Sequence, residues 1–196
     1  TLVDSMQLYL HSFNEVAAEF ALPKINEPQL RQAKQTPLSM LLKQYQIGPL
    51  KLAKIIDQLN RNLRREIASV KFFPEMRAIL LRLAQKYQLG MLSSNRLENI
   101  EDFLEKQNFT NVFDFVYASK NLFGKDKVLS GLIKKHQLDK KEVLYFGDEV
   151  RDIEACQKIG VKIAAVTWGF NDKKLLALKQ PDYLLASPQD IADLLL

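Results

Sequence analysis

The pattern of hydrophobic and polar positions divides the chain into two parts that predict different elements. Residues 6 to about 71 contain no segment typical of a β-strand. Apolar side chains at helical spacing predict a helix over 6–22. Two further helices are predicted over 37–47 and 49–70, each with a proline in its first turn. This part is therefore expected to form a small bundle of helices.

From residue 72 onward, helical patterns alternate with short apolar runs. Strands are predicted over 89–94, 113–119, 142–148, 162–169 and 182–187, and helices over 74–87, 96–108, 127–138, 150–160, 173–180 and 188–196. The runs are continuously apolar, which is typical of parallel strands that helices cover on both faces. The sequence therefore predicts an α/β fold with a Rossmann-like, doubly wound parallel sheet.

Polar side chains stand where several of these predicted strands end. They are Ser93, Ser94 and Asn95 after the first strand, Ser119 and Lys120 after the second, Asp148 and Asp152 after the third, and Thr167 after the fourth. Because ligands of such sheets bind at the carboxyl ends of the strands, these residues are the candidates for a functional site.

Composition narrows the class of protein. The chain has 196 residues and 22.6 kDa, enough for one domain with a small inserted part. No apolar stretch approaches twenty residues, so no membrane span is expected. Cys156 is the single cysteine, which excludes an internal disulfide and fits a buried, non-nucleophilic role. The first residues lack a basic leader, and a cytoplasmic location is expected.

The positive charge is concentrated in the helical part. The net charge is +5, whereas residues 24–71 carry ten basic and three acidic side chains, a local charge of +7 that leaves −2 elsewhere. Such a segment attracts a small phosphorylated substrate or nucleic acid, or it is simply a solvated helix surface rich in lysine. Nucleic acid is the weaker interpretation, because the basic residues are not interleaved with aromatic ones in a stacking pattern.

The most specific motif is GDEVRD, in which Asp148 follows a strand and Asp152 stands four residues later at a helix start. Two such carboxylates repel one another unless a cation or hydrogen bonds neutralise them. Mg²⁺ suits a site of this kind, because it prefers oxygen ligands and retains water molecules. The alternative is that these acidic residues only cap the helix.

Two further motifs point to a bound phosphate. In the sequence LSSN, a hydroxyl of Ser93 and the first N–H groups of the next helix form a phosphate site. In FGKDK, a lysine ahead of a helix can offset phosphate and carboxylate charge, and either Lys125 or Lys127 fits. Each motif alone is common where helices begin.

Together and in this order, the motifs resemble the haloacid dehalogenase superfamily, and more narrowly its phosphoglycolate-phosphatase-like hydrolases. The resemblance covers essentially the whole chain. It is carried by TLVDS at the start, by Phe73-Pro74-Glu75, and by the GDEVRDIEA, VTWGFN and PDYLLASPQDIADLL stretches. It implies a helical cap formed by residues 9–71, inserted in a core formed by residues 1–8 and 72–196.

The resemblance also implies an activity. The expected protein is a Mg²⁺-dependent phosphatase that acts on a small anionic phosphorylated metabolite through an aspartyl-phosphate. By position, Ser93 and Lys125 (or Lys127) are the expected catalytic residues. Ser94, Asn95 and Thr1 are expected to bind the substrate, and Asp148 with Asp152 to anchor Mg²⁺. A dehalogenase of the same fold uses no metal, and the paired acids argue against it.

The family pattern reads Asp-x-Asp-Gly-Thr, so the nucleophile and the acid/base aspartate are expected upstream of Thr1. We expect the intact protein to carry these residues and the strand that precedes them. The alternative is a catalytically inactive domain that serves as a binding or scaffold protein, although such a protein has no evident need for Ser93, Lys125, Asp148 and Asp152.

Overall fold

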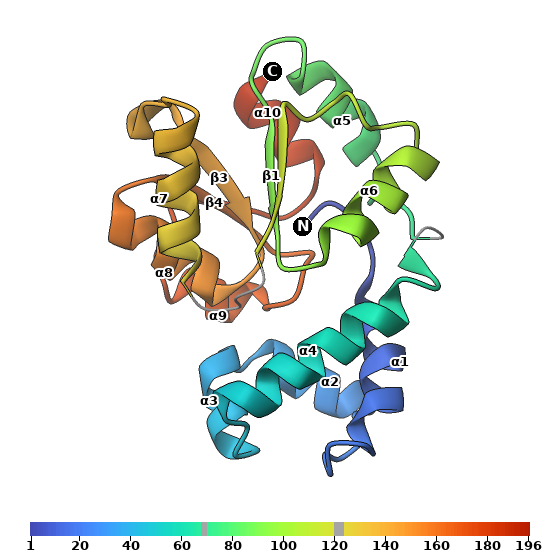
Figure 1. The fold of residues 1–196 in the computed structure, drawn as a ribbon. Helices are drawn as coiled ribbons and strands as arrows, with labels where there is room; N and C mark the ends of the chain where they lie inside the picture. Colours follow the sequence, from blue (N-terminus) through green and yellow to red (C-terminus); the bar gives the residue numbers. More distant parts are fainter. Residues whose placement is uncertain (68–69, 120–123) are drawn as a thin grey trace.

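The computed structural model describes residues 1–67, 70–119 and 124–196, and the candidate Lys120 lies outside these ranges. The helices are α1 (Met6–Ala17), α2 (Glu27–Lys34), α3 (Leu38–Gln44), α4 (Pro49–Leu63), α5 (Met76–Leu83), α6 (Leu97–Lys106), α7 (Lys125–Lys135), α8 (Val150–Ile159), α9 (Lys173–Ala177) and α10 (Gln189–Leu195). The strands are β1 (Gly90–Ser93), β2 (Phe115–Ala118), β3 (Leu144–Gly147), β4 (Lys162–Val166) and β5 (Tyr183–Leu185). Figure 1 shows α1–α4 as a separate group, called here the helical group, next to the remaining elements.

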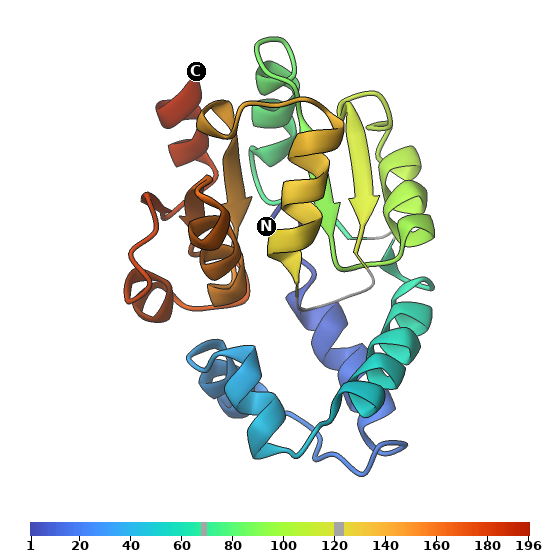
Figure 2. The same ribbon diagram turned by 60° about the vertical axis from the view of Figure 1, so that its left-hand side comes forward.

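The strands form two parallel sheets. In the first, β1 pairs with β2, and in the second the order is β3-β4-β5. Among the described residues, β1 and β3 are not hydrogen-bonded to one another. In Figures 1 and 2 the strand arrows point toward the helical group, so the carboxyl ends of both sheets face it.

Helices cover both faces of the sheets, as alternate side chains of β4 demonstrate. Ala164 and Val166 pack with buried residues of α5, α6 and α10. Ile163 and Ala165 pack on the other side with buried residues of α7, α8 and α9. Because successive side chains of a strand point to opposite faces and both faces are covered, β4 is apolar at each position after Lys162. The predicted doubly wound arrangement of parallel strands is confirmed.

Two extended segments of the chain connect the helical group to the sheets. Val3 and Phe72 form an antiparallel bridge, and Asp4 N–H donates to the carbonyl of Lys71 at 3.2 Å. Helix α1 begins at Met6, directly after this bridge, so the predicted boundary between residues 8 and 9 falls inside a helix. The segments through which the chain enters and leaves the helical group therefore lie side by side.

Helix α2 is an element that the hydrophobic pattern did not predict. Its sequence has only Leu30 buried, so it lacks an apolar face that would reveal it. A reciprocal capping box fixes its start: the Asn26 side chain accepts from Gln29 N–H, and the Gln29 side chain accepts from Asn26 N–H. The capping hydrogen bonds at its N-terminus, and not an apolar face, therefore specify this helix.

None of the helices in the described ranges is long and apolar enough to span a membrane.

Candidate active site

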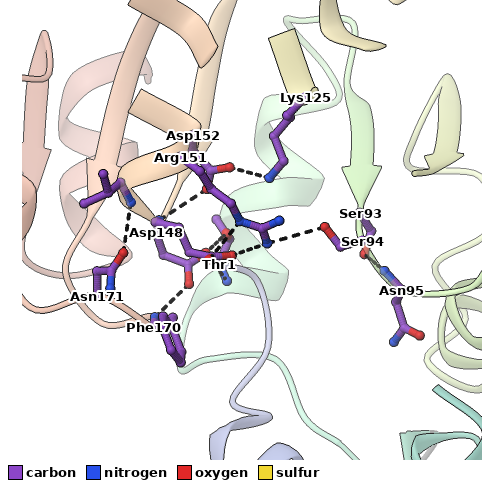
Figure 3. Close-up of polar contacts among 12 residues, drawn as sticks. Thr1, Ser93, Ser94, Asn95, Lys125, Asp148, Arg151, Asp152, Phe170 and Asn171 are labelled. Carbon is purple, nitrogen blue, oxygen red and sulfur yellow. Dashed lines mark hydrogen bonds and ion pairs between the residues drawn. The ribbon is translucent and has the colours of Figure 1, made fainter. Parts of the chain in front are cut away.

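A cavity of about 1230 Å³ runs from the helical group past the carboxyl ends of β1 and β3 and continues between these two strands as far as Tyr87 and Leu144. It brings together residues from distant parts of the sequence. Ser93, Ser94, Lys125, Asp148, Arg151 and Asp152 all line it. Figure 3 shows Ser93 and Ser94 on one side and the two aspartates on the other, so the predicted residues face a common space.

Asp148 follows β3 and is held by the loop after β4. One carboxylate oxygen accepts a hydrogen bond from Phe170 N–H at 2.7 Å, and the other accepts one from the Thr1 hydroxyl. A Cβ atom on Gly169 would lie 2.2 Å from the Asp148 Cβ, so only glycine lets this loop approach the carboxylate. Burial raises the pKa of Asp148, whereas the hydrogen bonds from the Thr1 hydroxyl and Phe170 N–H lower it.

Asp152 lies in the first turn of α8 and is almost fully buried. Its Oδ1 forms an ion pair with Lys125 Nζ, and its Oδ2 accepts from Glu149 N–H at 3.2 Å. Lys125 begins α7 and is itself buried, whereas Lys127 is exposed. The structure therefore brings Lys125, and not Lys127, into contact with the paired acids.

The capping alternative describes part of this arrangement. The N-cap of α8 is Glu149, and Asp152 completes a capping box with it. Asp148 does not cap the helix, because its oxygens accept from Phe170 and Thr1. Capping thus explains the contact of one oxygen of Asp152. It does not explain the ion pair between Asp152 and Lys125 or the position of Asp148.

Arg151 is a residue of the GDEVRD motif for which the sequence analysis proposed no role. Its guanidinium forms a two-pronged contact with Glu149, through Nε to Oε2 at 2.9 Å and through Nη2 to Oε1. It also reaches toward the Ser94 hydroxyl at 3.5 Å (Figure 3). Burial raises the pKa of Glu149 even though Arg151 opposes that shift. Arg151 therefore connects the turn after β3 with the turn after β1, and only the three-dimensional structure reveals it.

The residues after β1 play different parts. The Ser93 hydroxyl accepts from Asn95 N–H at 3.1 Å, which leaves its own proton available to a ligand. The Asn95 side-chain oxygen accepts from Arg96 N–H and from Asn99, each at 2.8 Å. Figure 3 shows Asn95 pointing away from Asp148. The Asn95 oxygen thus makes local contacts at the start of α6, while Asn95 also lines the cavity, and its substrate-binding role stays a prediction.

Other predicted positions lie around this centre. Thr167 N–H donates to the Leu185 carbonyl at 3.0 Å. Ser119 is buried directly after β2, and its N–H donates to the backbone carbonyl of Ser93 at 2.7 Å. Thr1 lines the cavity, and its carbonyl accepts from the Trp168 indole at 2.9 Å. Tyr9 enters from α1: desolvation of its hydroxyl, with Glu149 and Asp148 nearby, raises its pKa to about 12. That phenol stays protonated near neutral pH and can donate a hydrogen bond.

The donor set suits a hard cation that brings most of its own ligands. Among the residues that the structure describes, no cluster of three His, Cys, Asp or Glu side chains is placed to hold a metal. A carboxylate has about four lone-pair sites, so Asp148 keeps acceptor capacity beyond its bonds to Thr1 and Phe170. Mg²⁺ typically uses one or two carboxylates together with water and substrate phosphate. The remaining acceptor capacity of Asp148 could therefore supply one carboxylate ligand to such a cation, whereas both oxygens of Asp152 have partners in Lys125 and Glu149 N–H.

Comparisons of sequence place the chain among known proteins. The family described as haloacid dehalogenase-like hydrolase matches residues 1–166. A phosphoglycolate phosphatase of Synechococcus elongatus is 33% identical over 192 residues, which cover 97% of this chain and 91% of that protein. A phosphoglycolate phosphatase of Aliivibrio fischeri is 30% identical over 125 residues, which cover 58% of this chain and 55% of that protein.

Solved structures share the architecture. A predicted phosphatase from Clostridium acetobutylicum superposes with a TM-score of 0.85 at 18% identity, covering 98% of this chain and 92% of the other. A haloacid dehalogenase-like family hydrolase from Streptococcus pneumoniae gives a TM-score of 0.79 at 22% identity, covering 99% and 93%. At these identities the likeness concerns the fold, and it confirms the predicted combination of a Rossmann-like core with an inserted set of helices.

Proposed function

The chain belongs to the haloacid dehalogenase-like hydrolase family, and from that membership we propose that it is a Mg²⁺-dependent phosphatase. The proposed substrate is a small anionic phosphomonoester of the phosphoglycolate type, and the proposed intermediate is an aspartyl-phosphate. One observation carries the proposal: the buried Lys125–Asp152 pair lies beside Asp148 and faces Ser93 and Ser94 across one cavity. A phosphoryl group needs such a combination of hydroxyl, ammonium and carboxylate groups around it.

The side chains of this site have distinct proposed tasks. The hydroxyl of Ser93 donates to a phosphate oxygen, with support from Ser94 and from the N–H groups that open α6. Lys125 offsets the charge that develops on the phosphoryl oxygens. Asp152 holds the Lys125 ammonium in place, because the ion pair is buried between α7 and α8. Thr1 completes the substrate side, where it lines the cavity.

Asp148, with Asp152 behind it, would hold Mg²⁺. When bound, the ion screens the repulsion between an anionic nucleophile and an anionic substrate. The Phe170 N–H fixes one oxygen of Asp148, so this carboxylate is oriented before substrate arrives.

The covalent steps are assigned to the Asp-x-Asp pattern that is expected ahead of Thr1. In the first step one aspartate attacks phosphorus, the bond to the leaving alkoxide breaks, and the second aspartate protonates that alkoxide. In the second step the second aspartate removes a proton from a water molecule, which attacks phosphorus. The bond between phosphorus and the first aspartate breaks, and inorganic phosphate is released. The described residues stabilise charge in both steps.

We assign residues 9–71 the role of a cap over the site, with residues 1–8 and 72–196 as the core. The positive charge of residues 24–71 favours an anionic substrate. Basic side chains that line the cavity are Lys34 from α2, Lys125 and Arg151. Lys125 is paired with Asp152 and Arg151 with Glu149, whereas Lys34 forms none of the ion pairs observed between described residues. A second anionic group on the substrate, such as a carboxylate, could pair with Lys34.

Phosphate release by the intact protein tests the proposal. We expect hydrolysis of phosphoglycolate that EDTA abolishes and added Mg²⁺ restores, with slower hydrolysis of ethyl phosphate, a phosphomonoester that lacks the carboxylate. A rapid-quench experiment should trap protein-bound phosphate that hydroxylamine releases. The inactive scaffold interpretation predicts no turnover of any phosphomonoester in a broad panel, and that result would overturn the enzyme assignment.

A further inference from the structure

Asn171 is a buried polar side chain that joins three parts of the molecule. It is 2% exposed and lies between β4 and α9. Its backbone N–H donates to the carbonyl of Asp148 at 3.0 Å, and its Oδ1 accepts from Val150 N–H at 2.9 Å. Its Nδ2 donates to the carbonyl of Lys34 at 3.2 Å. Figure 3 shows Asn171 beside Asp148.

The contact with Val150 adds to the Glu149–Asp152 capping box in holding the start of helix α8. Val150 is the first residue of α8 and is buried, and the N–H groups of a first turn have no partner within their own helix. Because an unpaired buried N–H is unfavourable, the Asn171 oxygen holds this end of α8 in place. Asp148 and Asp152 lie on either side of Val150, so their positions depend on the same contact.

The contact with Lys34 depends on the position of the helical group. Lys34 is the last residue of α2, and its carbonyl accepts both from Asn171 Nδ2 and from Asp172 N–H at 3.0 Å. Figures 1 and 2 show α2 and α3 below the part of the chain that contains α9. Both hydrogen bonds break if the helical group moves away from the sheets. The Asn171 amide then keeps its bond to Val150 but loses its second anchor.

We propose that Asn171 is a positioning residue that couples closure of the helical group over the cavity to the position of the Asp148–Asp152 turn. It acts through Lys34 on one side and through Val150 on the other, and it touches neither substrate nor metal. The inference rests on the proposed phosphatase function. By reciprocity, ordering the Asp148–Asp152 turn with Mg²⁺ and phosphate should favour closure, just as closure orders that turn.

A second buried amide provides a matched control. Asn99 is 1% exposed, and its Nδ2 donates to the carbonyl of Asn60 in α4 at 3.0 Å. Asn99 therefore links α6 to a backbone carbonyl of the helical group, and its Nδ2 also donates to the Asn95 side chain at 2.8 Å. It makes none of the observed hydrogen bonds to Asp148, Val150 or Asp152. Replacing it loosens the helical group without touching the turn after β3.

The experiment measures hydrogen–deuterium exchange of residues 27–34 and 148–153 before and after addition of Mg²⁺ and inorganic phosphate. In the intact wild-type protein we expect both segments to become protected. In Asn171→Leu and Asn171→Ser, we expect residues 27–34 to stop responding and kcat to fall about tenfold, because the Asp148–Asp152 turn is no longer held in position. In Asn99→Ser, residues 27–34 should exchange faster but still respond to the additions.

Two results overturn the inference. One is an Asn171→Ser protein, folded by circular dichroism, in which residues 27–34 respond as in wild type. The other is an Asn99→Ser protein that loses the response to the same degree, because the effect would then be general loosening. A wild-type protein without phosphatase activity would overturn both the proposed function and this inference. An active wild-type protein, together with Asn171 variants in which residues 27–34 still respond to the additions, would overturn this inference alone.

Discussion

Lys125 and Asp152 form a buried ion pair although 26 residues lie between them in the sequence. Lys125 opens α7 and Asp152 lies in the first turn of α8, so the pair joins two helices that follow different strands. Their side chains are 10% and 4% exposed. The contact thus contributes both to the candidate site and to the packing of the two helices.

Breaking this pair on one side should destabilise the protein. Lys125→Met or Asp152→Asn leaves the other charged or polar group buried without its partner, and each should lower the free energy of unfolding by about 3 kcal/mol. The double variant should lose less than the sum, because no unpaired charge remains. Urea unfolding of the four proteins measures these differences. Single variants that each lose less than about 1 kcal/mol would contradict a buried pair.

Gly169 should tolerate no side chain, since a Cβ there would meet the Cβ and carboxylate of Asp148 within 2.4 Å. Gly169→Ala should displace that carboxylate, lower turnover at least tenfold and destabilise the protein by about 1–3 kcal/mol. Steady-state kinetics and thermal unfolding report both effects. Unchanged turnover would show that the position of Asp148 is unimportant for the reaction.

Gly131→Ala is the matched control for that substitution. Gly131 lies inside α7, and nothing stands within 4 Å of a Cβ placed on it. Because alanine favours a helix more than glycine does, this variant should gain about 0.5–1 kcal/mol of stability and keep its turnover. Its behaviour separates the effect of an added methyl group from the effect of crowding Asp148.

The Cys156 thiol should be inert in the folded protein. It is 1% exposed among Ile153, Ile163 and Leu176, and burial raises its pKa to about 12. At pH 8 the nucleophilic thiolate is therefore scarcely populated. Mass spectrometry after maleimide treatment should find no adduct under native conditions and one adduct in denaturant. Rapid native labelling together with loss of activity would contradict its assignment as a packing residue.

The alternation of elements in the second half was predictable because a doubly covered parallel strand is apolar throughout, as Ile163 to Val166 illustrate. Helix ends were less predictable. The pattern carried the first helix to residue 22, but α1 ends at Ala17 and Ala21 has a positive φ of 49°. The predicted helix over 49–70 likewise ends at Leu63. Apolar side chains recur past these helix ends: Phe20 and Leu22 are half-buried, and Ile67 and Val70 are buried.

The candidate site was predictable only where a strand leads directly into it. Asp148, Asp152 and Ser93 stand at strand ends, so topology alone placed them together. The choice between Lys125 and Lys127 required the structure, because it depends on which one α7 turns inward. Arg151 and Asn171 were missed because their partners, Ser94 and Lys34, are 57 and 137 residues away in the sequence.

The central claim is that Asp148 serves a Mg²⁺-dependent phosphatase. The most direct measurement is phosphate release from phosphoglycolate by the intact wild-type protein and by Asp148→Asn, as a function of Mg²⁺ concentration. We expect wild-type turnover to require Mg²⁺, and the variant, which remains folded, to lose at least a hundredfold in kcat/KM, about 2.7 kcal/mol of transition-state stabilisation. An Asp148→Asn protein with wild-type turnover and the same response to Mg²⁺ would contradict the account.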